Sequence, residues 1–79
     1  MRKEDFLTEL FNVLEIESIK NLTEDTILRD LPEYTSLSVL SIIVLVDENF
    51  NKKITAVELK GITTVKSLIN LIGLDNFEA

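Results

Sequence analysis

The stretch SLSVLSIIVLVDENF runs from Ser36 to Phe50 and contains the most apolar segment of the chain, Ile42 to Val46. Its apolar residues recur at helical spacing, so we predict a helix over 36–50. Placed on a helix of about 100° per residue, they fall on two arcs. The arc expected to face the core consists of Val39, Ile42, Ile43, Val46 and Phe50. The second arc consists of Leu37, Leu40 and Val44, together with Ser41, Asp47 and Glu48. We therefore expect the second face either to serve something other than the core or to be covered by a loop.

Three further helices are predicted on the same reasoning. They span Lys3 to about Leu14, Ala56 to Lys60, and Thr64 to Ile72. Their inward residues are expected to be Leu7, Leu10, Phe11 and Leu14 in the first, and Val65, Leu68, Ile69 and Ile72 in the last. Gly61 and Gly73 follow the last two helices, where glycine supplies the left-handed conformation that closes a helix. The sequence thus predicts an all-α fold, a small bundle of three main helices and one short helix.

The segment from Glu15 to Thr35 holds the only proline of the chain, Pro32, and scattered apolar residues. We predict that it is a long first loop. The residues expected to pin it to the core are Ile16, Ile19, Leu22, Ile27, Leu28 and Leu31. A loop of about 20 residues is unusual in a compact domain, and such loops usually have a function.

Composition narrows the classes of function. A chain of 79 residues predicts a single domain over 1–79 with one core. There is no cysteine for a disulfide or thiolate metal site, and no histidine, the commonest general base and metal ligand. The net charge of −6 argues against nucleic-acid binding and favours partners with basic patches. No secretory signal pattern or bilayer-length apolar run is visible, so we expect a cytoplasmic protein without membrane insertion.

The segment DENFNKKITAVE, from Asp47 to Glu58, partly matches the calcium-binding loop of an EF-hand. Lys52 stands where that loop requires glycine for its sharp turn, and Lys52 and Lys53 place positive charge where the cation would bind. We therefore predict no metal site here. The segment is interpreted as the end of one helix, a loop and the start of the next helix.

Two pairs of adjacent carboxylates, Glu24–Asp25 and Asp47–Glu48, could be considered for acid catalysis. Such catalysis needs two carboxylates in different environments, whereas neighbouring charges at helix ends and in loops are usually solvated. Without histidine or cysteine, and with only two glycines, neither a nucleophile triad nor a phosphate-cradling loop can be assembled. The sequence predicts a protein that is not an enzyme.

Ser36 stands at the predicted start of the second main helix. Thr35 or Ser36 could cap this helix, because a side-chain hydroxyl accepts a hydrogen bond from a free backbone N–H there, worth about 1 kcal/mol. Capping alone would explain a serine at this position. The surrounding residues favour a second interpretation.

Around Ser36 the chain resembles the acyl carrier proteins. These proteins attach a 4′-phosphopantetheine arm to the serine of a Gly-x-Asp-Ser-Leu motif at the start of their second helix. The corresponding residues here are Glu33-Tyr34-Thr35-Ser36-Leu37. The resemblance covers about Lys3 to Asp75. It includes Leu22-Thr23-Glu24-Asp25-Thr26, Leu28 and Asp30-Leu31 before the serine, Asp47-Glu48-Asn49-Phe50 at the end of the next helix, and Ile54 and Gly61-Ile62-Thr63-Thr64-Val65 before the last helix.

The resemblance implies that Ser36 is the attachment site for 4′-phosphopantetheine derived from coenzyme A, with Thr35 and Leu37 beside it. The arm would hold an acyl group as a thioester. The implied partners are a phosphopantetheinyl transferase and acyl-transferring or acyl-ligating enzymes with basic surface patches, and their transient contacts imply a monomer. The implied partner surface comprises Leu37, Leu40, Ser41, Val44, Asp47 and Glu48. The implied shelter for the acyl chain lies among Val39, Ile43 and Val46.

Three positions depart from the family's pattern. Thr35 replaces the aspartate that helps the transferase place its metal ion and the incoming cofactor, Glu33 replaces the glycine, and Ser41 replaces an acid. These departures favour a carrier for one dedicated fatty-acid, polyketide or related pathway. They also leave open an alternative, in which the fold is never modified and acts as a protein-interaction module.

Overall fold

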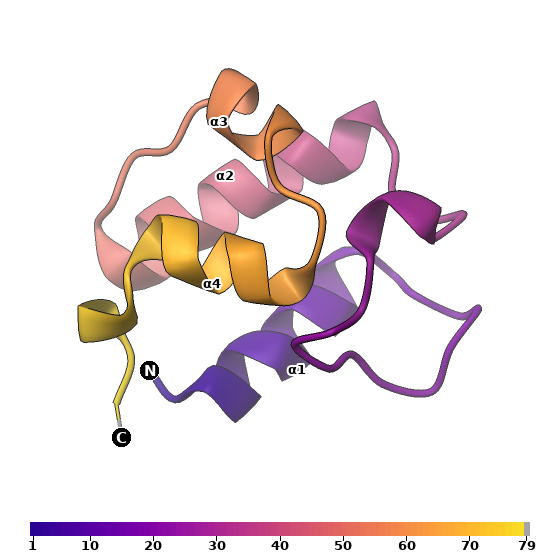
Figure 1. The fold of residues 1–79 in the computed structure, drawn as a ribbon, viewed down its shortest axis with the longest axis horizontal. Helices are drawn as coiled ribbons and strands as arrows, with labels where there is room; N and C mark the ends of the chain where they lie inside the picture. The colour runs from indigo at the N-terminus through magenta and orange to yellow at the C-terminus, as the bar shows by residue number, and fades with distance from the viewer. Residues whose placement is uncertain (79) are drawn as a thin grey trace.

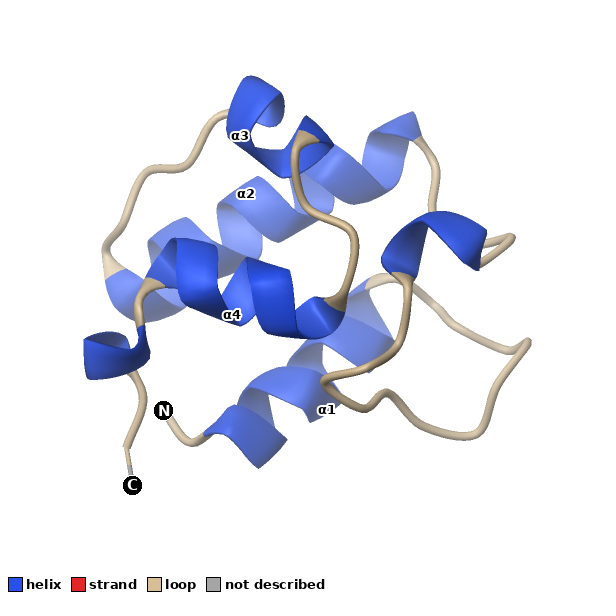
Figure 2. Ribbon diagram, in the orientation of Figure 1, coloured by secondary structure: helices blue, strands red, loops and turns tan. Residues whose placement is uncertain are grey.

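The structure is a computed structural model, and it describes residues 1–78. Four α-helices and two short 3-10 turns follow one another, and no β-strand is present between residues 1 and 78 (Figure 1, Figure 2). The elements are α1 (Lys3–Val13), η1 (Leu28–Asp30), α2 (Ser36–Phe50), α3 (Ala56–Lys60), α4 (Val65–Ile72) and η2 (Leu74–Asn76). The predicted all-α bundle of three main helices and one short helix is confirmed.

The predicted helix bounds agree closely with the structure. The ranges of α2 and α3 are those predicted, α1 ends one residue earlier than expected, and Thr64 is the N-cap of α4 and not its first helical residue. The Thr64 hydroxyl oxygen accepts the Ser67 N–H at 3.1 Å, which explains why the helix starts where it does. None of the helices in the described part of the chain has the length and apolar character needed to cross a membrane.

The core lies between α1, α2 and α4, and its best-defined contribution comes from α4. The four inward residues predicted for α4 are all fully buried: Val65, Leu68, Ile69 and Ile72. In α1 the prediction was incomplete, because Phe6 is fully buried with Leu10, whereas Leu7 and Phe11 are only partly buried. Phe6 makes edge-to-face contacts with Phe50 and Phe77, at ring-centroid distances of 5.7 and 5.5 Å.

Helix α2 is rotated slightly from its predicted orientation. Ile42 and Val46 are fully buried as expected, but Ser38 and Leu45 are buried as well, while Val39 and Ile43 are only partly buried. The buried positions therefore follow the sequence 38, 42, 45 and 46, a stripe of three- and four-residue steps centred next to the predicted one. The loop does not cover the second apolar arc.

The long loop between α1 and α2 docks against the start of α4, although the two are far apart in sequence (Figure 1). The N–H groups of Val65 and Lys66 donate to the carbonyls of Thr26 and Glu24 at 3.0 and 2.8 Å, and the Leu28 N–H donates to the Thr63 carbonyl at 3.0 Å. The free N–H groups of the first turn of α4 thus find partners in the loop.

Five of the six residues predicted to pin the loop pack against the core: Ile16, Leu22, Leu28 and Leu31 are buried, and Ile19 is partly buried. The prediction is wrong for Ile27, whose surface is 45% exposed. Ile27 forms an isolated antiparallel bridge with Thr64, in extended backbone conformation. Successive side chains of an extended segment point in opposite directions, so Leu28 turns inward and Ile27 outward.

The two glycines close their helices in different ways. Gly73 has φ of +105°, and its N–H donates to the Ile69 carbonyl at 2.9 Å, so a residue with positive φ ends α4 as predicted. Gly61 has φ of −84° and ψ of −11°, so the predicted left-handed conformation is wrong there. The chain leaves α3 through a tighter turn, in which the Ile62 N–H donates to the Leu59 carbonyl at 3.3 Å.

Candidate functional site at the start of α2

The start of α2 is capped by Thr35 and Ser38. The Thr35 N–H donates to the Ser38 hydroxyl oxygen at 2.8 Å, and the Ser38 hydroxyl donates to the Glu33 carbonyl at 2.9 Å. Ser38 is only 5% exposed, so these bonds are sheltered from water. The sequence did not single out Ser38, although its position three residues after the cap is typical of a capping box.

Ser36 is therefore not needed as the cap. It is the first residue of α2, its side chain is exposed, and its hydroxyl makes no hydrogen bond with any other residue in 1–78. The first turn of the 15-residue helix carries no acidic residue. Free backbone N–H groups and the helix dipole favour a phosphate at such a position. The hydroxyl is accessible and lies where a phosphodiester would be stabilised.

Glu33 ties the first loop to the entry of α2. Its Oε2 accepts the N–H groups of Glu17 and Ser18 at 3.0 and 2.9 Å, and its Oε1 accepts the Ser18 hydroxyl at 2.7 Å. The bonds from the Glu17 N–H and the Ser18 hydroxyl stabilise the ionised form and lower the pKa of Glu33 from 4.5 to about 2. In the sequence Glu33 stands out only as a replacement for glycine, and this role is not predicted.

Tyr34 lies between Glu33 and the cap and is partly buried. Burial raises the pKa of its phenol above the ordinary value of 10, and the positive charge of Arg29 acts in the opposite direction. The ring therefore remains neutral at physiological pH and adds no negative charge next to Ser36.

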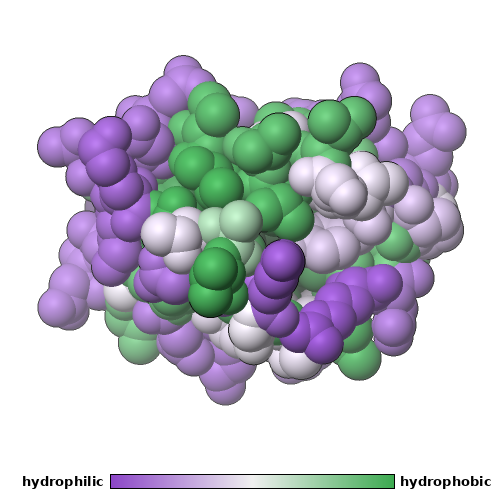
Figure 3. Space-filling model, turned by 90° about the horizontal axis from the view of Figure 1, so that it is seen from above, coloured by the Kyte–Doolittle hydropathy of each residue, from purple (hydrophilic) through white to green (hydrophobic). Residues whose placement is uncertain are grey.

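The second apolar arc of α2 is open to solvent. Leu37, Leu40 and Val44 are 73%, 59% and 53% exposed, so this helix carries the surplus apolar face that the sequence predicted. Figure 3 shows apolar side chains gathered in one area on the side formed by α2 and α3. Val57 of α3 is also 77% exposed and belongs to the exposed apolar residues of the chain.

Four of the predicted partner-binding residues line one shallow hollow of about 320 Å³, formed with the end of α1. Its lining residues are Val13, Leu40, Ser41, Val44, Leu45 and Glu48. Val13 was missed by sequence reasoning because it lies off the apolar stripe of α1. The Ser41 hydroxyl is turned back onto α2, where it donates to the Leu37 carbonyl at 3.1 Å. Asp47 lies at the far end of the arc, half-buried, with its Oδ2 3.8 Å from Lys53 Nζ.

The residues expected to shelter an acyl chain are part of the packed core or its border. Val46 is fully buried, and Val39 and Ile43 are partly buried against the core. The hollow on the exposed arc of α2 is lined by none of these three residues. A chain entering between the helices would have to displace packed side chains.

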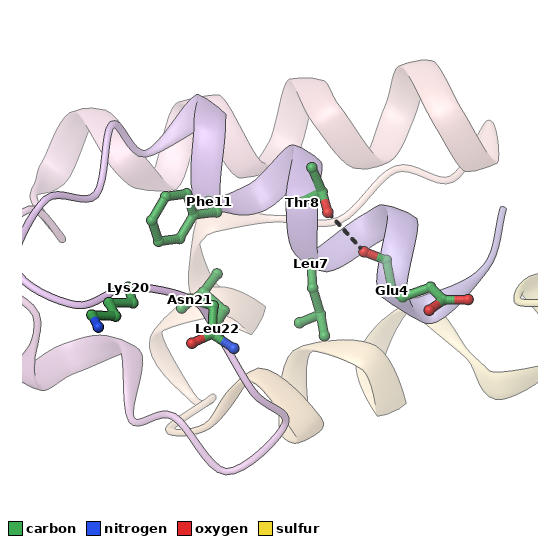
Figure 4. Close-up of a pocket in the computed structure, with 7 residues that line it drawn as sticks. All are labelled: Glu4, Leu7, Thr8, Phe11, Lys20, Asn21 and Leu22. Carbon is green, nitrogen blue, oxygen red and sulfur yellow. Dashed lines mark hydrogen bonds between the residues drawn. The ribbon is translucent and has the colours of Figure 1, made fainter.

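Another hollow, of about 370 Å³, lies between α1 and the loop (Figure 4). Leu7 and Phe11 of α1 extend toward the loop at Lys20 to Leu22. Thr8 of α1 also lines the hollow, and its hydroxyl donates to the Glu4 carbonyl at 3.1 Å (Figure 4). The hollow is open to solvent and separate from the residues around Ser36.

The segment that resembles an EF-hand loop is used for capping. Glu58 Oε1 accepts the Thr55 N–H at 3.0 Å, and the Thr55 hydroxyl oxygen accepts the Glu58 N–H at 3.2 Å. The two residues thus form the capping box of α3. Among residues 1–78, no three His, Cys, Asp or Glu side chains are grouped in a way that could hold a metal ion.

Comparison of the chain with models of protein families, with curated proteins and with solved structures finds no match.

Proposed function

We propose that this protein is an acyl carrier protein that holds acyl intermediates as thioesters on a 4′-phosphopantetheine arm attached to Ser36. The observation that carries the proposal is the position of Ser36. Ser36 is exposed and is the first residue of a long helix, and it does not cap that helix, because Thr35 and Ser38 supply the cap. Together with the resemblance of the residues around it, this makes Ser36 the residue that modification would use.

The expected modification is a phosphoryl transfer. The Ser36 oxygen forms a phosphoester bond with the phosphopantetheine of coenzyme A, the pyrophosphate bond of coenzyme A breaks, 3′,5′-adenosine diphosphate leaves, and the serine proton is released. The transferase supplies catalysis, and this chain supplies the nucleophile and its placement. Once attached, the phosphodiester is held at the positive end of α2.

The proposed partner surface is the exposed arc of α2. Leu37, Leu40 and Val44 supply apolar contact area, and Glu48 and the half-buried Asp47 add negative charge beside them. Enzymes with basic patches around an apolar contact fit this pattern. The proposal places the protein in the cytoplasm, as a monomer, in a dedicated fatty-acid, polyketide or related pathway.

The first test is the intact mass of the protein after incubation with coenzyme A, Mg²⁺ and a broad-specificity phosphopantetheinyl transferase. The expected result is a mass gain of one phosphopantetheine, which is absent in Ser36→Ala. Helix content measured by circular dichroism should remain the same, because Ser36 makes no side-chain hydrogen bond within residues 1–78. A variant that still accepts the arm would contradict the assignment of Ser36.

The alternative, an unmodified carrier-like interaction module, rests on Thr35. Thr35 caps α2 but brings no carboxylate beside Ser36. Thr35→Asp supplies that carboxylate, and aspartate is an equally good cap. If the wild-type protein gains no mass while a control carrier is fully converted, loading of Thr35→Asp would trace the loss to this residue and favour the interaction module.

A further inference from the structure

We infer that Glu33 is a positioning residue for the modification of Ser36, an inference that rests on the proposed function. Glu33 lies three residues before Ser36. Its carboxylate binds Glu17 and Ser18, which are 16 and 15 residues away along the chain. Its carboxylate holds the first loop and its backbone carbonyl holds the first turn of α2.

The side-chain half of this connection consists of three hydrogen bonds. Both oxygens of Glu33 are used, and their partners are the N–H groups of Glu17 and Ser18 and the Ser18 hydroxyl, at 2.7 to 3.0 Å. Hydrogen bonds to an ionised acceptor are stronger than neutral ones, and two N–H donors on one oxygen fix the direction of the carboxylate as well as its place.

The backbone half reaches the helix. The Glu33 carbonyl accepts the hydroxyl of the buried Ser38, and the same hydroxyl accepts the Thr35 N–H. Ser36 lies between Thr35 and Ser38 in the chain, within the segment that these two hydrogen bonds hold in place. When Glu33 is held in place, the backbone that leads into α2 is held as well, and with it the position of the Ser36 hydroxyl.

Loss of the Glu33 carboxylate should lower the fraction of molecules in which Ser36 is correctly placed for the transferase. If only a fraction of molecules present the serine correctly, the apparent affinity of the transferase for the carrier falls by that fraction, whereas the bound complex reacts as before. The expected signature is a raised KM with kcat nearly unchanged. A residue that merely adds global stability would not produce it at temperatures well below unfolding.

The experiment measures kcat and KM of the transferase for the carrier. Glu33→Ala is expected to raise KM about 10-fold, the factor expected if a tenth of the molecules keep the native arrangement. Glu33→Gln is expected to recover most of the loss, because its amide oxygen accepts the two N–H groups and its amide nitrogen donates to Ser18 Oγ. Ser18→Ala, which removes one of the three bonds, is expected to show a smaller rise. Glu17→Ala is the matched control: it removes a charge from the same loop, and the Glu17 carboxylate makes no hydrogen bond within residues 1–78.

Each outcome separates the inference from the proposed function. Loading of the wild type with unchanged KM in Glu33→Ala would overturn the inference and leave the proposed function intact. So would a rise in KM that Glu17→Ala reproduces, since the loss of a negative charge from the loop, and not of the Glu33 hydrogen bonds, would then be responsible. A wild type that is never loaded would overturn both. Should Glu33→Ala fail to fold, Ser18→Ala decides: a raised KM with unchanged kcat supports the inference, and a KM equal to that of the wild type overturns it.

Discussion

Glu33 illustrates how a single side chain can set the pH response of a small protein. In the unfolded chain its carboxylate has the ordinary pKa of 4.5, whereas in the folded protein the hydrogen bonds from Glu17 and Ser18 lower the pKa to about 2. A lowered pKa in the native state means that the ionised carboxylate stabilises the fold. This contribution is fully present above pH 4.5 and is lost as the pH falls toward 2.

We predict that Glu33→Gln weakens this acid response. The free energy of unfolding of the wild type should fall between pH 4.5 and 2, because folding must release the proton that the unfolded Glu33 binds. The variant should be less stable at pH 7, because it loses the charge-assisted bonds, but should lose less on acidification. Urea unfolding at pH 7, 4.5, 3 and 2 measures both quantities.

The control is Glu17→Gln, a charge removal in the same loop that leaves the Glu33 hydrogen bonds in place. It should keep the part of the acid response that belongs to Glu33. Parallel pH curves for the wild type and Glu33→Gln would contradict the assigned role of the Glu33 carboxylate.

Helix α4 is the element on which the loop depends. N–H groups of its first turn donate to the carbonyls of Thr26 and Glu24 in the loop and to the hydroxyl oxygen of its own cap, Thr64. Its inward residues fill the core. The loop has little regular structure of its own, but its backbone is hydrogen-bonded to a helix end that needs partners. Destabilising the first turn of α4 should therefore weaken the hydrogen bonds that hold the loop as well.

We predict that Thr64→Ala lowers the free energy of unfolding by about 1 kcal/mol, the usual cost of losing a side-chain cap. The affected bond is the one from the Ser67 N–H to the Thr64 hydroxyl oxygen. Thr63→Ala is the matched control, since Thr63 is exposed and its side chain makes no hydrogen bond within residues 1–78. Chemical denaturation measures both variants, and amide exchange at Leu28 reports on the loop. Equal stability of the two variants would show that the Thr64 cap is not important.

The three phenylalanines Phe6, Phe50 and Phe77 hold together the parts of the chain that are furthest apart in sequence. Phe6 meets Phe50 and Phe77 edge-on, and the rings of Phe50 and Phe77 lie 4.9 Å apart between centroids. The two ends of the described chain also meet nearby, where the Glu78 N–H donates to the Met1 carbonyl at 3.0 Å (Figure 1). This cluster closes one end of the bundle.

We predict that Phe6→Ala lowers the free energy of unfolding by about 3 to 5 kcal/mol, through lost burial and the cavity left among the remaining rings. A loss of that size is a large part of the stability of a domain this small. Leu40→Ala is the comparison: Leu40 is 59% exposed, and its truncation should change stability by less than about 0.5 kcal/mol. Urea midpoints measure both, and similar effects of the two variants would contradict the described core.

Leu40→Ala has a second predicted effect, on the proposed function. Leu40 lines the hollow beside Val44 on the exposed arc of α2, so its truncation should weaken binding of a partner enzyme without destabilising the carrier. Transferase KM for Leu40→Ala compared with Val57→Ala, an exposed truncation on α3, measures this effect. An equal KM for wild type and Leu40→Ala would argue against this arc as the contact surface.

The amino-acid sequence alone was enough to place the four helices. Their limits depend on the spacing of apolar residues and on caps such as Thr35, Thr55 and Thr64, all of which act within a few residues. The spacing of apolar residues also indicated that α2 has more apolar surface than one core can bury. The sequence also drew attention to Ser36, but could not separate a capping serine from a free one.

The tertiary structure decided everything that depends on partners distant along the chain. In the folded chain Ser38 and Leu45 are buried, Phe6 is buried in contact with Phe50 and Phe77, and Ile27, which is bridged to Thr64, is exposed. Glu33 gained its role only because the fold brings Glu17 and Ser18 to its carboxylate. Local periodicity carries no record of such contacts, because the residues that make them are joined by packing and hydrogen bonds and not by their spacing in the chain.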